Sequence, residues 1–168
     1  QGFYHPYSWT VRQFKENSIH ESYVYFAPNG TPLGFRRTIP EDEPGAALSE
    51  ADARTLGEQE LNHWAYKLTD FKLINSSHQQ QKNGRLDYTF VYEAINKQIK
   101  DAPYRLKIKV RGKLVTDIYL TVKIPDAFKK KYQEMRSYNE TLAALATFIL
   151  YFFFFLFIRK NNIHNSFF

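Results

Sequence analysis

Short stretches of alternating apolar and polar side chains open the chain, and this two-residue period is typical of β-strands with one buried face. Residues 7–12 alternate in this way, and a second apolar run follows at residues 23–26. Asn29 and Gly30 then predict a tight turn, because both residue types tolerate the positive φ angles that hairpins need. With a return strand over residues 33–39, we predict an N-terminal hairpin or three-stranded unit.

A helix is predicted after residues 40–45, where proline and glycine interrupt the strand pattern. Ser49, followed by Asp52 three residues later, resembles a capping box, which satisfies free N–H groups at the start of a helix. Apolar side chains then recur at helical spacing. We predict a helix whose buried stripe contains Ala53, Leu56, Leu61, Trp64 and Leu68.

Three or four further strands are predicted after this helix, at residues 71–76, 86–92, 104–110 and 114–124. Polar or glycine-containing segments separate them, as expected of antiparallel turns. One helix among short antiparallel strands indicates an α+β fold, in which the helix covers one face of an antiparallel sheet. A cystatin-like or similar arrangement is our prediction.

An uncharged stretch of eighteen residues lies at positions 141–158. As a helix it would be about 27 Å long, close to the ~30 Å thickness of a bilayer core. The alternative, a buried core helix, is less favoured because the stretch is apolar all round and a basic pair follows it directly. Residues predicted within this single membrane span include Thr141, Phe148, Tyr151, Phe152, Phe153, Phe154, Phe155 and Ile158.

A second, amphipathic helix is predicted just before the span, over residues 125–140, with Pro125 in its first turn. We expect it to run on into the span, with a bend near residues 137–139 as an alternative. The predicted organisation is therefore a soluble α+β domain (1–124), the juxtamembrane helix (125–140), the span (141–158) and a short polar tail (159–168). The predicted membrane-interface residues are Lys129, Lys130, Arg136, Arg159 and Lys160.

The sequence carries few signs of catalysis. It contains no cysteine, which excludes disulfides, thiolate nucleophiles and Cys-ligated metals. It has neither a phosphate-binding loop nor a nucleophile elbow, and none of its five histidines is spaced to bind a metal together with another. The acidic run at residues 41–43 precedes a helix, where solvated carboxylates are favoured. We predict no catalytic residue, cofactor or metal site in this chain, and leave open whether a longer relative is an enzyme.

Basic side chains alternate along one predicted strand and form its strongest electrostatic feature. They are Arg105, Lys107, Lys109 and Arg111, on the face opposite Leu106 and Ile108. These four residues are a candidate anion-binding or partner-binding face, and the alternative is the solvated side of an antiparallel strand. The formal net charge is +6, but the charges are spread along the chain, and one basic strand is too little for nucleic acid. We therefore expect no nucleic-acid partner.

Four segments resemble a known family when taken in order. They read LSEADAR at residues 48–54, GRLDYTFVYE at 84–93, KIPDAF at 123–128 and YQEMRS at 132–137. The chain resembles, over most of residues 9–142, the soluble region ahead of the membrane core in bacterial CPBP-family (Abi-type) intramembrane metalloproteases. The resemblance implies a catalytic Glu-Glu pair, an arginine and histidines within membrane helices, and none of these is present in this sequence.

Three functions are therefore expected. The first is a membrane-anchored, non-catalytic binding or regulatory module, resembling the accessory domain of such a protease. The second is a single-pass accessory or structural subunit of a larger membrane complex, and the third is a fragment of a full-length intramembrane metalloprotease. The expected partners are membrane lipid and an integral membrane protein.

The side of the membrane on which the domain lies is predicted from two opposing signals. Four basic residues precede the span closely and two follow it, a count that by itself favours a cytoplasmic domain. Long domains are translocated regardless of nearby charge, and the family resemblance suggests the other side. We predict an extracytoplasmic, periplasmic-side domain.

Overall fold

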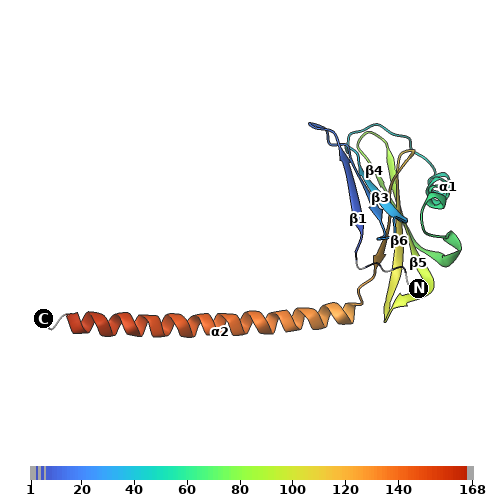
Figure 1. The fold of residues 1–168 in the computed structure, drawn as a ribbon. Coiled ribbons are helices and arrows are strands. Elements are labelled where there is room, and N and C mark those ends of the chain that lie inside the picture. Colours follow the sequence, from blue (N-terminus) through green and yellow to red (C-terminus); the bar gives the residue numbers. More distant parts are fainter. Residues whose placement is uncertain (1–2, 4, 6, 166–168) are drawn as a thin grey trace. The chain divides into compact units, whose positions relative to one another are not determined.

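The chain consists of two compact units, Gln1–Lys123 and Ile124–Phe168. The computed structural model describes residue 3, residue 5 and residues 7–165, with side chains described up to residue 159. The first unit is a seven-stranded antiparallel sheet with one helix (Figure 1), which confirms the predicted α+β class. The second unit is a single long helix.

The sheet has the strand order β1-β2-β3-β7-β6-β5-β4. Neighbouring strands are consecutive in the sequence except at β3 and β7, because the chain crosses from β3 to the far edge of the sheet before β4 begins. The helix α1 lies within this crossover and covers one face (Figure 1). The elements are β1 (Trp9–Phe14), β2 (Glu21–Phe26), β3 (Pro32–Thr38), α1 (Glu50–Glu60), β4 (Phe71–Gln80), β5 (Leu86–Ile99), β6 (Ala102–Arg111) and β7 (Leu114–Val122).

Strand β6 has the clearest alternation between a buried and a polar face. Leu106, Ile108 and Val110 are completely buried and belong to the core cluster. The helix can approach this strand closely because Gly57 faces it, and a Cβ at Gly57 would lie 2.7 Å from Cγ2 of Ile108. The predicted cap is present too, since the Asp52 N–H donates to the Ser49 hydroxyl at 3.2 Å.

The predicted helix is wrong in its length, because α1 ends at Glu60 rather than reaching Leu68. Two short 3₁₀ turns follow, Leu61–His63 and Leu68–Asp70. Trp64 leaves the helical path with φ −118° and ψ 168°. It then stacks on Phe35 with ring centroids 5.0 Å apart. Packing of these large side chains on the sheet outweighs continuation of the helix.

Strands β4 and β5 also extend beyond their predicted ends. The segment from residue 96, expected as a turn, instead continues β5 to Ile99, and the reversal is confined to Lys100 and Asp101. The pairing of β5 with β6 shifts register between Glu93 and Gln98. Asn96 has a φ of 58° in this interval, so an irregularity in the strand replaces the expected loop.

Helix α2 (Asp126–Asn165) is continuous, with no break at residues 137–139. It begins directly after Pro125, whose carbonyl accepts the Lys129 N–H at 3.1 Å. It is long and apolar enough to cross a membrane once, and none of its most apolar window is buried. Such exposure within its own unit is expected of a membrane span rather than of a buried core helix.

Candidate functional site

The sheet face opposite α1 is the candidate site, because within the first unit α1 packs on the other face only. We call it the open face. The four predicted basic residues of β6 lie on it together and are all half-buried. Directly opposed residues in an antiparallel sheet share a face, so the register places Thr89 of β5 and Asp117 of β7 beside Lys109. The same face continues through Arg36, Tyr23 and Arg12.

Ion pairs divide the basic residues of the open face into two groups. Arg105 pairs with Glu93 at 3.1 Å, and Arg36 pairs with Asp117 at 3.2 Å. Arg12 of β1 is likewise paired with Glu21. Lys107, Lys109 and Arg111, in contrast, form no ion pair within the described residues, so they leave a positive row along β6.

Aromatic rings lie between several of these cations. Arg36 and Lys107 both lie over the ring of Tyr119, at 5.1 and 5.9 Å from its centroid. Burial, followed by the nearby charge of Asp117, raises the pKa of Tyr119 above its ordinary value. The open face therefore combines cations with hydroxyl donors and aromatic surface.

Arg85 anchors one end of this face and was not predicted as a functional or structural residue. It is 1% exposed. Its guanidinium contacts both carboxylate oxygens of Asp87, at 2.8 and 3.1 Å, and donates to the carbonyls of Pro40 and Glu43. A polar pocket of about 310 Å³ lies beside this cluster, and His78, Gln79, Lys109 and Arg111 help to line it. Arg85 holds the pocket wall in place, and Arg111 and Lys109 supply its unpaired charge.

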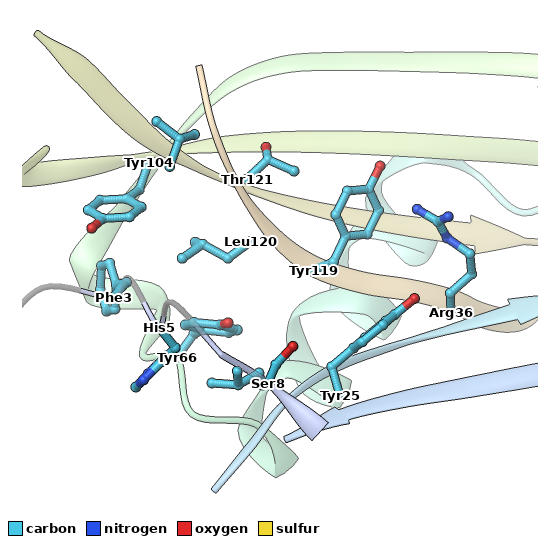
Figure 2. Close-up of a pocket in the computed structure, with 12 residues that line it drawn as sticks. Phe3, His5, Ser8, Tyr25, Arg36, Tyr66, Tyr104, Tyr119, Leu120 and Thr121 are labelled. Carbon is cyan, nitrogen blue, oxygen red and sulfur yellow. The ribbon is translucent and has the colours of Figure 1, made fainter. Parts of the chain in front are cut away.

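A second pocket, of about 390 Å³, opens where the sheet divides (Figure 2). The register of β3 with β7 contains only Phe35 opposite Ile118 and Arg36 opposite Asp117. Beyond these two pairs the strands are no longer paired, and residues from both sheet faces line the space between them. We call this space the split pocket.

The split pocket has a polar end and an apolar end. Figure 2 shows Arg36 beside Tyr119 at one end, with the hydroxyl of Tyr25 directed toward the same region. The opposite end contains Phe3 and the buried Tyr104, whose rings meet edge to face at 5.5 Å. The lining between these ends is completed by Leu33, Tyr66, Leu120, Thr121, Val122, His5 and Ser8.

The membrane-interface residues lie on α2, and two of them have local ion-pair partners. Lys129 is 3.6 Å from Asp126, and Arg136 is 2.9 Å from Glu140. Lys130 and Arg159 are exposed, whereas the side chain of Lys160 lies outside the described residues. The predicted span residues Thr141, Phe148, Tyr151, Phe152, Phe153, Phe154, Phe155 and Ile158 are all exposed on this helix.

The described residues contain no group of three or more His, Asp or Glu side chains that could hold a metal ion. The closest pairs involving histidine are His20 with Glu43 at 3.6 Å and His63 with Glu60 at 3.7 Å. Comparison with family models, curated proteins and solved structures finds no match. The arrangement is that of an antiparallel sheet domain with one helix, followed by a single long apolar helix.

Proposed function

We propose that the chain is a membrane-anchored, non-catalytic binding module. Helix α2 is the anchor, and the open face of the sheet contacts an anionic region of a membrane-protein partner. The observation that carries the proposal is the charge balance of this face, where the carboxylates of Glu21, Glu93, Asp87 and Asp117 pair with arginines while Lys107, Lys109 and Arg111 form no ion pair within the described residues. An acidic partner surface would supply the missing charge.

Site-specific photo-crosslinking in the native membrane tests this proposal. A photoreactive residue at Thr89 would stand beside Lys109 on the open face. The matched control places it at Gln59, an exposed position of α1. We expect one discrete crosslinked product from position 89, lost when Lys107, Lys109 and Arg111 are changed to glutamine, and none from position 59. Equal products from both positions, or no effect of the triple change, would contradict the proposal.

Placement of the domain on the extracytoplasmic side is part of the proposal. The family resemblance supports it, while the basic residues ahead of the span oppose it. Protease added to intact spheroplasts should therefore digest the domain without permeabilisation. Protection until the membrane is opened would place the domain in the cytoplasm.

A second candidate function is an accessory subunit of a larger membrane complex. The observation in its favour is the aromatic surface of α2, where Phe152, Phe153 and Phe154 are each more than half exposed. Such a surface can pack against neighbouring membrane helices. Purification in mild detergent separates this function from the first, since a subunit should co-migrate with a stoichiometric complex.

The proposed kinship with CPBP-family proteases has its own test. The encoding gene should continue into further hydrophobic spans that carry a Glu-Glu pair and histidines. A gene with these spans would make this chain part of an intramembrane metalloprotease, and the binding module would then be its accessory domain.

A further inference from the structure

The split pocket has the shape and polarity of a site for a small amphiphile. Its volume of about 390 Å³ falls near the lower end of the range for ligand pockets, which is roughly 300–1,000 Å³. That volume suits one acyl chain or one aromatic side chain rather than a large cofactor. The apolar lining of Leu33, Leu120 and Tyr104 would surround such a group.

Arg36 gives the polar end of the pocket its chemical preference. Its Nε donates to Asp117 at 3.2 Å, which fixes the plane of the guanidinium, and its side chain is 49% exposed. Among the hydrogen bonds of the described residues, Arg36 donates to a carboxylate only through Nε, and the two terminal Nη groups, near the Tyr119 hydroxyl, have no carboxylate partner. Asp117 is itself buried and accepts a second bond from the Thr116 hydroxyl at 3.0 Å, so the arginine is held on a fixed support.

A planar guanidinium with two free nitrogens matches a carboxylate, which can accept both hydrogen bonds side by side. We propose that the split pocket binds a small ligand whose apolar body ends in a carboxylate, with the body against Leu33 and Leu120 and the carboxylate on the Nη groups of Arg36. This inference deepens the proposed function, on which it rests, by adding a ligand site to the binding domain. A short fatty acid and the C-terminal end of a peptide share the required chemistry.

Calorimetric titration of the full chain in phosphatidylcholine nanodiscs tests this site, with empty nanodiscs as the blank. The probes are octanoate and N-acetylphenylalanine, which distinguish the two sources, and their amides, which lack the charge. We expect at least one carboxylate to bind and its amide to bind roughly ten- to a hundredfold more weakly, as for loss of a charged hydrogen bond. Arg36→Gln should reduce carboxylate affinity by a similar factor.

Two further variants guard against misfolding and non-specific charge effects. Arg37→Gln removes the neighbouring, exposed arginine that does not line the pocket, and it should leave affinity unchanged. Ser8→Trp places a large side chain at an exposed lining position without disturbing the Arg36 ion pair, and it should abolish binding. The inference is overturned if neither carboxylate binds, or if binding survives both Arg36→Gln and Ser8→Trp. Because crosslinking at position 89 uses none of these residues, its success or failure judges the proposed function separately.

Discussion

At the scale of single residues, the buried tyrosines should lower the free energy of unfolding at alkaline pH. Burial raises the pKa of Tyr66 from 10.0 to about 12. Between these values the unfolded chain loses the phenolic proton while the folded chain keeps it, so the free energy of unfolding falls as pH rises. The contribution of Tyr66 to the free energy of unfolding is therefore fully present below pH 10, and up to about 3 kcal/mol of it is lost by pH 12. Thermal unfolding of the detergent-solubilised chain between pH 8 and 12 should show this decline.

The matched variant is Tyr66→Phe, which removes the ionisable hydroxyl and keeps the ring. It should flatten the decline without removing it, because burial and a hydrogen bond to Glu58 raise the pKa of Tyr92 as well. An unchanged pH profile in Tyr66→Phe would show that Tyr66 does not contribute.

Arg85 is the residue on which we expect the fold to depend most strongly. Its replacement by methionine keeps much of the buried volume but leaves Asp87 and two loop carbonyls without their main donor. Removing one partner of a buried ion pair costs about 3–5 kcal/mol. Urea unfolding followed by tryptophan fluorescence should show this loss. Arg54→Met, which breaks an exposed pair with Glu58, should cost no more than about 1 kcal/mol. Equal effects of the two changes would refute the anchoring role of Arg85.

At the scale of elements, the junction between β3 and β7 is the expected weak point in the stability of the sheet. Only two residue pairs join these strands. Gly34 sits at the junction with a φ of 153°, and a Cβ there would collide with the carbonyl oxygen of Ile118. Backbone cannot give way as a flexible side chain can. Gly34→Ala should therefore force β3 away from β7 and loosen β1 and β2 with it.

Hydrogen exchange can localise this effect. We expect faster amide exchange in β1 to β3 of Gly34→Ala, with little change in the pairing of β5 with β6, and an overall loss of roughly 1–3 kcal/mol. Gly30→Ala is the control, because that turn glycine has open space around it and carries only the strain of its positive φ. Uniform exchange across the sheet would mean that the domain unfolds as one unit and that the junction is not a weak point.

The sequence predicted these elements well where a short-range pattern existed. Alternation identified the strands, and the Ser49 cap identified the start of α1. The end of α1 could not be predicted, because it depends on Trp64 stacking on Phe35 from a distant strand. The basic row of β6 was predicted from its spacing, but the ion pair of Arg105 with Glu93, which sets that arginine apart, arises only when β5 pairs with β6. The split pocket had no sequence signal, since it results from incomplete pairing between strands far apart in the chain.

At the scale of the whole molecule, the two units differ in whether their apolar side chains are buried. The sheet domain buries a continuous core of aromatic and branched side chains against α1. Helix α2 buries none of its most apolar window, although its surface is rich in leucine and phenylalanine. So large an apolar surface is rarely left in water. A bilayer resolves this contrast, because a helix satisfies its own backbone hydrogen bonds and can expose apolar side chains to lipid.

Charged substitutions in α2 test directly whether this helix lies in the lipid bilayer. Ile149 and Phe153 lie one helical turn apart near the middle of the apolar stretch. Arginine at the centre of a membrane helix costs about 2.5–3.5 kcal/mol on the insertion scale, so the double change Ile149→Arg with Phe153→Arg should cost roughly twice that amount. The wild-type chain should resist alkaline carbonate extraction, whereas the double-arginine chain should appear in the supernatant. Changing the same two residues to leucine keeps the helix apolar and should leave the chain in the membrane pellet. If the double-arginine chain also stays in the pellet, α2 is held by protein contacts rather than by lipid, and the accessory-subunit function gains over a simple anchor.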